Sequence, residues 1–273
     1  MIASAVGHQR RLARIFQGPR ERTMIVALDA TLISNGIPDP ASMIAKVSAG
    51  KPDAVMGFAG LLRCFHGELV RTPTILNLTG STIRSAETRK ELVHDLETAQ
   101  ELDAEAVALH ANIGGAHERE MLRNLGLVAA QASRNGLPVL AIMYPRSEME
   151  DLDSPATRAR DPQRYAALVA HAVRIGVDLG ADVVKTQFTG DVSSFRDVVK
   201  AAGSVPIVIA GGSVRTPPEL LRMTREALSA GASGICYGRN VFESADAVRV
   251  LEALRAVVHE DALSDCIEQG FGS

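Results

Sequence analysis

The chain alternates eight short apolar runs with segments of helical spacing. The runs lack the strict in–out alternation of half-exposed strands, so we expect strands that are covered on both faces, as in parallel sheets. They occupy Thr23–Asp29, Ala54–Phe58, Pro73–Thr79, Ala106–Asn112, Pro138–Tyr144, Asp182–Thr189, Pro206–Gly212 and Gly234–Arg239. Eight strands alternating with helices predict an α/β fold of the (β/α)8, or TIM barrel, type. A doubly wound open sheet is the alternative, and the absence of GxGxxG after the first run weakens it.

The segments between the runs carry the spacing of helices and the residues typical of helix ends. Helices are predicted at Ala86–Leu102, His117–Asn135, Pro162–Leu179, Pro217–Ala230 and Ala245–Glu260. Pro162 and Pro217 fit a first helical turn, and Gly180 and Gly231 fit a helix C-terminus. We expect a helical N-terminal extension over residues 1–22, one barrel domain over residues 23–261 and a tail over residues 262–273. That tail is interpreted as either an oligomer contact or a frayed end.

Composition narrows the class of partner. The 273 residues include 29 Lys and Arg against 32 Asp and Glu, a net charge of −3, which argues against a nucleic acid or a membrane surface bound through bulk charge. No apolar run approaches the ~20 residues of a membrane span.

The cysteines and histidines are not spaced as ligands or as disulfide partners. Cys64, Cys236 and Cys266 are far apart without a CxxC, so we expect neither a disulfide framework nor a zinc site. The basic cluster follows the apolar N-terminus, the reverse of a secretory signal, and a cytoplasmic protein is predicted. The seven histidines lack metal-ligand spacing, so we expect no metal.

One lysine is placed unlike the others. Lys185 lies inside the sixth predicted strand, whereas Lys46, Lys51, Lys90 and Lys200 fall on predicted helices or turns, where solvated charges are ordinary. Burial lowers the pKa of an ammonium group, and a neutral amine can attack a carbonyl to form a Schiff base, which acts as an electron sink. Lys185 is therefore a candidate nucleophile. The alternative is a lysine that emerges at the strand end and pairs with a carboxylate.

Polar residues at the ends of other predicted strands favour the catalytic interpretation. Asp29 ends the first strand, Tyr144 ends the fifth and His110 lies near the end of the fourth. In a barrel these ends converge on one mouth, where a carboxylate and a phenol can transfer protons. Each also has a structural interpretation: Asp29 as a turn cap, Tyr144 as a core ring and His110 as a hydrogen-bonded core residue, the more common role of a histidine.

Glycine-rich turns follow the seventh and eighth predicted strands, at Gly211-Gly212 and Gly238-Arg239. In barrels the loops after these two strands frequently hold a phosphate. Glycines let backbone N–H groups approach the anion, and Arg239 can add a forked contact. Two adjacent glycines alone are equally typical of a simple turn, and the neighbouring Gly-Arg pair favours a phosphate site.

Four motifs follow one another along the chain: Ile142–Arg146, Val184–Thr186 with Gly190-Asp191, Ala210–Gly212 and Gly238–Phe242. Together they resemble the archaeal-type class I aldolases, and the resemblance covers roughly Thr23 to Glu260. That family includes fructose-bisphosphate aldolase and 2-amino-3,7-dideoxy-heptulosonate synthase. It also includes a branch that joins dihydroxyacetone phosphate to aspartate semialdehyde and, more distantly, an autoinducer-processing thiolase.

The resemblance implies roles for seven residues. It implies that Lys185 forms the Schiff base, that Tyr144 is the acid/base group and that Asp29 is its carboxylate partner. It further implies that the donor phosphate is bound at Gly211, Gly212, Gly238 and Arg239. The enzyme is expected to need no metal or other cofactor and to form a homo-oligomer of barrels, often a decamer in this family.

Two departures from the family pattern bear on the substrate. The first strand is followed by Asp29-Ala30-Thr31 where the family commonly has Asp-His-Gly, and Ser147 stands where a glycine usually follows Pro-Arg. We therefore predict an aldolase acting on a phosphorylated ketone such as dihydroxyacetone phosphate, with aspartate semialdehyde preferred as the aldehyde. The alternatives are glyceraldehyde 3-phosphate as acceptor, a phosphosugar isomerase or metal-dependent aldolase, and a non-catalytic phosphosugar-binding barrel.

Overall fold

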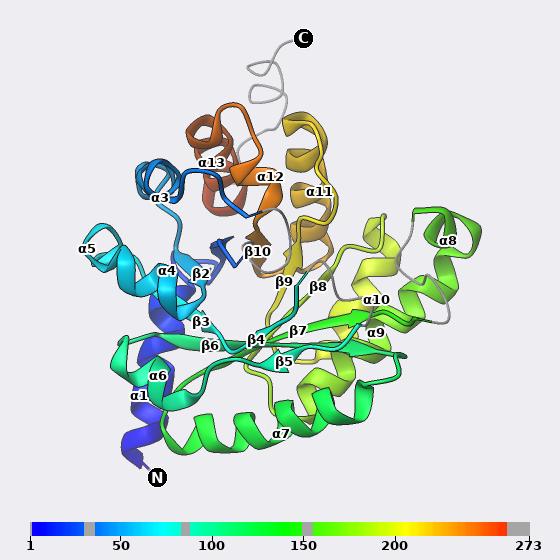
Figure 1. Ribbon diagram of the computed structural model, residues 1–273. Coiled ribbons are helices and arrows are strands. Elements are labelled where there is room, and N and C mark those ends of the chain that lie inside the picture. The colour runs from blue at the N-terminus through cyan, green and yellow to red at the C-terminus, as the bar shows by residue number, and fades with distance from the viewer. Residues whose placement is uncertain (1, 30–35, 83–87, 149–154, 261–273) are drawn as a thin grey trace.

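Eight parallel strands close into a barrel (Figure 1). The computed structural model describes residues 2–29, 36–82, 88–148 and 155–260. The barrel strands are β1 Thr23–Ala27, β2 Ala54–Gly57, β3 Thr74–Asn77, β6 Ala106–Ile113, β7 Val139–Pro145, β8 Val183–Gln187, β9 Ile207–Ala210 and β10 Gly234–Tyr237. Their order around the ring is β1-β10-β9-β8-β7-β6-β3-β2, and β2 pairs with β1 to close it. The predicted (β/α)8 barrel is confirmed, with a strand in each of the eight predicted runs.

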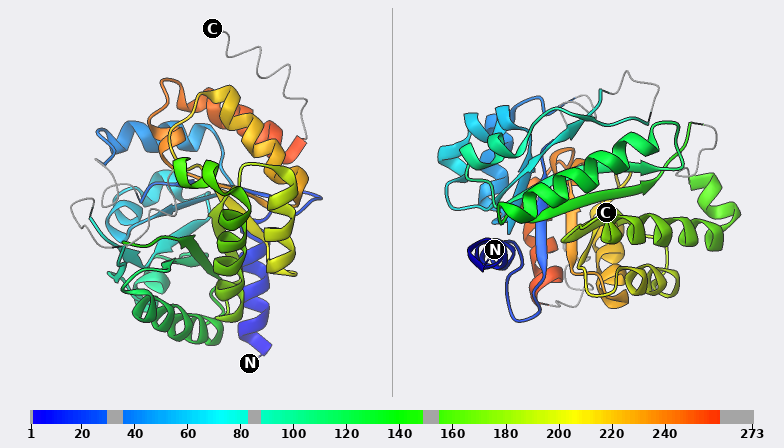
Figure 2. Two further views of the ribbon diagram at one scale, coloured as in Figure 1. Left: turned by 90° about the vertical axis from the view of Figure 1, so that its right-hand side faces the viewer. Right: turned by 90° about the horizontal axis from the view of Figure 1, so that it is seen from below.

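Helices surround the barrel on its outer side (Figure 2). They are α1 Ile2–Ile15, α3 Pro40–Ala49, α4 Ala59–Cys64, α5 His66–Leu69, α6 Leu96–Glu101, α7 Glu118–Arg134, α8 Pro155–Arg160, α9 Pro162–Asp178, α10 Val192–Ala202, α11 Pro217–Ala230, α12 Arg239–Phe242 and α13 Ala247–Arg255, which continues into a π-helical turn at Ala256–Glu260. Side chains cap several N-termini: Asp161 accepts from the Arg164 amide, Asp191 accepts from the Ser194 amide, and a capping box opens α11. Four of the five predicted helices are present near their predicted bounds, as α7, α9, α11 and α13 with its π-helical turn.

The helix predicted at Ala86–Leu102 is wrong over most of its first half. Residues 83–87 lie outside the described part of the chain, and Glu91–Leu92 forms a strand, β5, paired antiparallel with β4 at Thr79–Gly80. The backbone of Val93 continues this attachment by donating to the Leu78 carbonyl over 2.8 Å. A helix begins only at Leu96, because the Asp95 carboxylate caps it by accepting from the Thr98 amide. Residues 88–95 therefore form part of a hairpin beside the barrel mouth.

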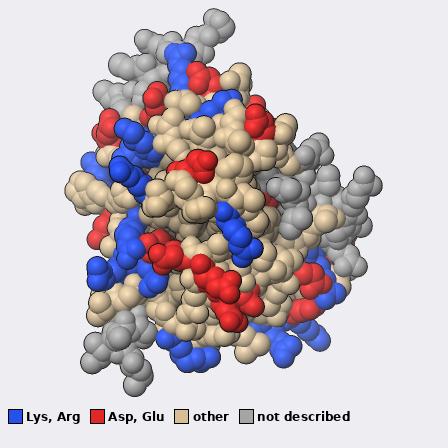
Figure 3. All heavy atoms as spheres, turned by 60° about the vertical axis from the view of Figure 1, so that its left-hand side comes forward, with Lys and Arg blue, Asp and Glu red and all other residues tan. Residues whose placement is uncertain are grey.

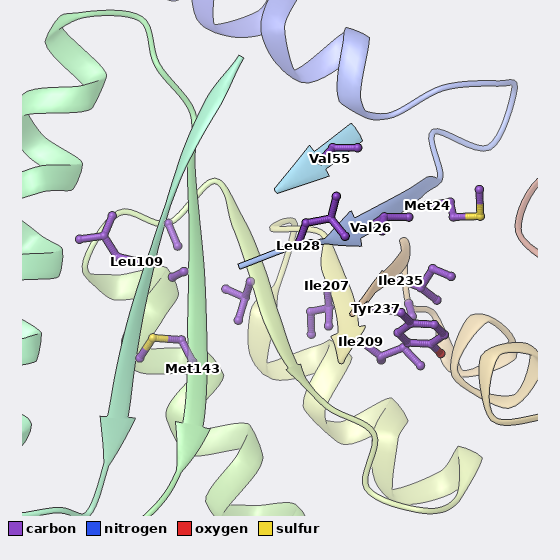
Figure 4. Close-up of a cluster of buried hydrophobic side chains, with 14 of the residues drawn as sticks. Met24, Val26, Leu28, Val55, Leu109, Met143, Ile207, Ile209, Ile235 and Tyr237 are labelled. Atoms are coloured by element: carbon purple, nitrogen blue, oxygen red, sulfur yellow. The ribbon is translucent and has the colours of Figure 1, made fainter. Parts of the chain in front are cut away.

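Each barrel strand alternates its side chains between two apolar cores. The outer core, part of which is shown in Figure 4, packs between strands and helices, and the inner core fills the barrel. On β8, Val183 belongs to the inner core and Val184 to the outer core, so the period of two directs Lys185 inward. The inner core contains many alanines. Ala27 is the last residue of β1, and Ala210 is the last residue of β9. Their small side chains leave room at that end of the barrel.

The N-terminal helix α1 covers the opposite end of the barrel. Ile15 is part of the inner core. His8 Nε2 lies 2.9 Å from Asp182 Oδ1, just before β8, and Arg14 pairs with Glu105, just before β6. The predicted helical extension is thus a helix packed on the amino ends of the strands, while the predicted tail over residues 262–273 lies outside the described residues.

The surface of the described chain carries mixed charge. Basic and acidic side chains lie close to one another on the face shown in Figure 3. Within the described ranges, the helices are all too short or too polar to cross a bilayer.

Candidate active site

A cavity of about 310 Å³ lies at the mouth formed by the carboxyl ends of the strands. In barrels of this type the active site occupies that end. The structure brings all seven residues predicted for the site into its lining: Lys185, Tyr144, Asp29, Gly211, Gly212, Gly238 and Arg239. The catalytic and phosphate-binding parts of the prediction therefore share one cavity.

Lys185 lies within β8 and is 7% exposed. The alternative was a lysine that emerges at the strand end and pairs with a carboxylate. Lys185 does not emerge there, although the Asp29 carboxylate does act on its charge. Its amino group is hydrogen-bonded to the thiol of Cys236, which projects inward from β10. Burial lowers the pKa of Lys185, but Cys236, Tyr144 and Asp29 raise it, and the net direction is upward. The expectation of a lowered pKa is therefore wrong for the empty site, because negative and polar partners outweigh the loss of solvation. The amine is protonated at rest and has to lose a proton before it can attack.

Asp29 is oriented by a side chain from a neighbouring part of the ring. Asn77, the last residue of β3, donates from Nδ2 to Asp29 Oδ2 over 2.7 Å. The other end of the Asn77 amide is fixed, because its Oδ1 accepts from the Thr79 amide over 3.1 Å and from the Thr79 hydroxyl over 3.2 Å. The Asp29 carboxylate is 6% exposed and lines the cavity. It is held as an acceptor facing the site.

Tyr144 is packed between two other cavity residues. The ring of His110 meets it edge-on, with centroids 4.9 Å apart and an interplanar angle of 84°. The guanidinium carbon of Arg146 lies 5.0 Å from the centroid of the Tyr144 ring. These contacts hold the phenol at the wall of the cavity.

His110 is a neutral ring at neutral pH. Burial, together with the positive charges of Lys90 and Arg146, holds its pKa well below the ordinary value. Its Nε2 lies 2.9 Å from Asn112 Oδ1, and Asn112 Nδ2 donates to the Thr88 carbonyl over 2.5 Å. With the amide oxygen turned toward the ring, His110 donates from Nε2 and keeps Nδ1 as an acceptor. His110 is therefore a hydrogen-bonded structural residue at the cavity wall, which was the structural interpretation of the sequence.

The loops after β9 and β10 are tied together by side chains. Arg239 Nη2 donates to the Gly212 carbonyl over 2.9 Å. The buried Asn240 donates from Nδ2 to the carbonyls of Gly211 and Ser213, at 3.2 Å each, and accepts from the Arg215 amide over 2.8 Å. The two glycine turns therefore form one connected wall of the cavity.

Two of these glycines are required by the backbone. Gly212 has a φ of +67°, in the left-handed region that favours glycine. At Gly238 a Cβ would lie 2.8 Å from the carbonyl oxygen of Ala27, so the close approach of β10 to β1 excludes a side chain. The loops thus bring bare backbone to the cavity, as anion binding requires.

Sequence reasoning missed four residues of this site. Asn77 is a polar residue near the end of the third apolar run, as Asp29 is at the end of the first, and that similar position was a usable signal. Asn240 follows Gly238-Arg239 directly, and Cys236 occupies the inward position on its strand, but neither residue type indicated a role by itself. Lys90 was predicted on a solvated helix, and it lines the cavity because the segment forms a hairpin instead.

The described residues also bear on metal binding and on the altered loop after the first strand. Among the residues that the structure describes, no group of three or more His, Cys, Asp or Glu is arranged to hold a metal ion. The departure at Ala30-Thr31 falls in residues 30–35, outside the described part of the chain.

A protonatable amine buried at the floor of a cavity, with a carboxylate, a phenol and glycine loops that carry Arg239, defines an enzyme that binds carbonyl compounds covalently on a (β/α)8 barrel. The model of the DeoC/LacD family aldolases matches residues 22–244. The chain belongs to this family, and the prediction of a class I, Schiff-base aldolase is confirmed.

Relatives and solved structures agree with this assignment. The chain is 36% identical over 258 residues to 2-amino-3,7-dideoxy-D-threo-hept-6-ulosonate synthase of Halobacterium salinarum, covering 94% of this chain and 93% of that protein. It is 34% identical over 257 residues to 2-amino-4,5-dihydroxy-6-oxo-7-(phosphonooxy)heptanoate synthase of Streptomyces griseus, covering 91% and 89%. An archaeal fructose-1,6-bisphosphate aldolase superposes with a TM-score of 0.80 at 28% identity, covering 92% and 99%. In that structure the catalytic Lys is covalently bound to the carbinolamine intermediate of the substrate.

Proposed function

We propose that this enzyme joins dihydroxyacetone phosphate to aspartate semialdehyde through a Schiff base on Lys185. One observation carries the proposal: a buried lysine amine faces a cavity that holds a carboxylate and a phenol beside the connected glycine loops of β9 and β10. The loops and Arg239 are suited to a phosphate, and the amine is suited to a ketone. A phosphorylated ketone satisfies both.

The product name of the Streptomyces relative supports the choice of substrates. Its seven-carbon chain carries a phosphate at C7, a ketone at C6 and hydroxyls at C5 and C4. An aldol reaction forms the bond between the carbon next to the ketone and the carbon bearing the new hydroxyl, here C5 and C4. Cutting that bond gives dihydroxyacetone phosphate from C5–C7 and aspartate semialdehyde from C1–C4. The Halobacterium relative's product has the same skeleton without the C7 oxygen, and the phosphate-suited loops favour the phosphorylated donor.

The first half of the reaction takes place at the donor ketone. After losing its proton, the Lys185 amine adds to the carbonyl carbon, and the resulting carbinolamine releases water to leave a protonated imine. The imine draws electrons from the neighbouring C3–H bond, so a base can remove that proton and form an enamine. The Asp29 carboxylate accepts the proton that Lys185 has to lose and returns it to the carbinolamine hydroxyl, which leaves as water. Tyr144 is the proposed acid/base group at C3: its hydroxyl passes its own proton to the Asp29 carboxylate, and its oxygen takes the C3 proton.

The second half forms the carbon–carbon bond. The enamine C3 attacks the aldehyde carbon, and the aldehyde oxygen takes up the proton held by the Tyr144 hydroxyl. Water then adds to the regenerated imine and releases the ketone product and the free Lys185 amine. Each proton removed in the first half is returned in the second, so no external reductant or oxidant is needed.

Fructose-bisphosphate cleavage is the second candidate, favoured by the superposition on the archaeal aldolase. The two functions differ in the acceptor, aspartate semialdehyde or glyceraldehyde 3-phosphate. Dihydroxyacetone phosphate should therefore be offered with each aldehyde in parallel and the products identified by mass spectrometry. We expect the seven-carbon amino acid phosphate and a higher kcat/KM for aspartate semialdehyde. Formation of the hexose bisphosphate alone would assign the second function, and no product with either aldehyde would refute both.

The oligomeric state and the cellular compartment of the enzyme are predictions. The family resemblance predicts a homo-oligomer of barrels, up to a decamer, and the sequence predicts a cytoplasmic enzyme that binds neither nucleic acid nor membrane. Light scattering of the purified chain would measure the oligomer directly, and a monomeric mass would contradict the first of these predictions.

A further inference from the structure

The mechanism above gives two basic residues of the cavity no contact with the substrate. Lys90 lies directly before β5 on the hairpin, and Arg146 directly follows β7. Both line the same cavity as Lys185 and Asp29. Their charges act on the site, because both Lys90 and Arg146 lower the pKa of His110.

Lys90 lies across the mouth from the glycine loops, and Arg146, after β7, is close enough to act on the charge of Lys90. The loops follow β9 and β10, whereas the hairpin that carries Lys90 lies between β3 and β6. In the ring order, β3 and β6 are separated from β9 and β10 by the remaining strands on either side, which is the opposite wall of an eight-stranded barrel. Lys185, on β8, projects into the space between the two walls.

If the enzyme has the proposed function, the donor and the acceptor occupy different parts of the cavity. A donor held by its phosphate at the glycine loops and by its carbonyl carbon at Lys185 points its third carbon toward the opposite wall. The acceptor aldehyde must approach that carbon, so its far end lies on the side of Lys90 and Arg146. A negative group at that end would meet two cations.

The hairpin that carries Lys90 is held in place at the mouth. Asn112 binds the Thr88 carbonyl over 2.5 Å, and Glu148, from the loop after β7, accepts from the Thr88 amide over 2.8 Å. Lys90 itself donates to the Ser81 hydroxyl. These contacts anchor the backbone two residues before Lys90 and fix the direction of its side chain.

The electrostatics of Lys90 agree with an anion subsite. Burial and the neighbouring Arg146 lower the pKa of Lys90 to about 8, although Asp29 opposes this shift. Four titratable groups face this part of the cavity besides Lys90: Arg146, Asp29, Lys185 and the neutral His110. An anionic substrate placed between the two cations would offset their mutual repulsion.

We infer that Lys90 and Arg146 form the subsite that binds the anionic group of the acceptor, a carboxylate or a phosphate, and so select charged aldehydes over neutral ones. Arg146 supplies a planar fork of donors, and Lys90 supplies a compact charge that tolerates either anion. The subsite determines acceptor specificity and takes no part in Schiff-base formation at Lys185.

The test compares pairs of acceptor aldehydes in which one member carries an anionic group and the other does not. Succinic semialdehyde and butanal are four-carbon aldehydes with and without a carboxylate, and glyceraldehyde 3-phosphate and glyceraldehyde differ by a phosphate. The variants are Lys90→Gln and the matched control Lys46→Gln, on the exposed face of α3. Exchange of the donor C3 hydrogen with solvent, measured without any aldehyde, reports the donor half of the reaction separately.

We expect Lys90→Gln to reduce the preference for the charged member of a pair by about tenfold, through the KM of the aldehyde, while donor exchange is retained. Lys46→Gln should match the wild type. Loss of preference in one pair identifies carboxylate or phosphate as the natural anion. The pKa of Lys90 is about 8, so at pH 9 the wild-type preference should fall toward that of Lys90→Gln. In Lys90→Arg the preference should keep its full size at pH 9, because arginine stays protonated.

Two results would separate the possible failures. An unchanged preference in Lys90→Gln, or an equal loss for charged and neutral aldehydes, would overturn the subsite while leaving the proposed reaction intact. Absence of donor exchange in the wild-type enzyme would instead refute the proposed function on which the subsite depends.

Discussion

Removal of the Asn240 side chain tests whether the loops after β9 and β10 bind the donor phosphate. Asn240 is 5% exposed and joins three backbone groups of the loop: the carbonyls of Gly211 and Ser213 and the amide of Arg215. In Asn240→Ala all three bonds are lost, and the bond from Arg239 to the Gly212 carbonyl remains to join the two loops. The glycine backbone that faces the cavity would no longer have one fixed arrangement.

The structure sets the size of the effect. A hydrogen bond contributes about 0.5–1.5 kcal/mol net, and two of the three are long at 3.2 Å, so we estimate a total of about 2 kcal/mol. If about half of this energy orders the loop for binding, the KM for dihydroxyacetone phosphate rises about fivefold, because 1.4 kcal/mol corresponds to a factor of ten. The remainder appears as a lower free energy of unfolding.

Steady-state kinetics with two donors would check this expectation. Dihydroxyacetone phosphate should lose affinity in Asn240→Ala, and unphosphorylated dihydroxyacetone should be affected much less. Asn124→Ala, on the outer helix α7, is the matched control and should leave both donors unchanged. An equal loss for the two donors would refute the reasoning, because the loop would then act on the enzyme as a whole and not on the phosphate.

Three further predictions concern other parts of the site. Asp29→Asn removes a carboxylate that raises the pKa of Lys185, so borohydride trapping of the donor should extend to lower pH; an unshifted profile would contradict this cause. Hydrogen bonds to Glu148 lower its pKa to about 2 from 4.5, so its stabilisation is present above pH 4.5 and is lost as the pH falls toward 2. Thermal unfolding should separate Glu148→Gln from the wild type at pH 6 and bring the two together near pH 2, and a constant difference would refute this account. Gly238→Ala places a Cβ 2.8 Å from the carbonyl oxygen of Ala27 and should cost about 1–3 kcal/mol in urea denaturation, whereas unchanged stability would show that β10 can move.

The barrel and the centre of the site were predictable because both follow from the period of the strands. Apolar runs of the right length and spacing indicated eight strands, and a lysine inside one of them stood out against its neighbours. In a closed barrel the carboxyl ends of all strands share one mouth, so Asp29, Tyr144 and Lys185 were brought together by topology alone.

The hairpin at residues 88–95 and the pKa of Lys185 were harder to predict from the sequence. Residues 88–95 contain only two apolar residues, Leu92 and Val93, which fit a helix as well as a short strand. Only the cap at Asp95 shows where the helix begins. Lys90 was consequently placed on the surface. The pKa of Lys185 was predicted in the wrong direction because burial was visible in the sequence, while the thiol of Cys236 beside the amine depended on the register between distant strands.

Covalent trapping shows whether Lys185 carries the donor as a Schiff base. The wild-type enzyme should be incubated with dihydroxyacetone phosphate and borohydride, which reduces the imine to a stable secondary amine, and the modified peptide should then be identified by mass spectrometry. We expect one reduced donor on Lys185 and no adduct in Lys185→Met. An adduct on another lysine, or turnover that persists in Lys185→Met, would contradict this expectation.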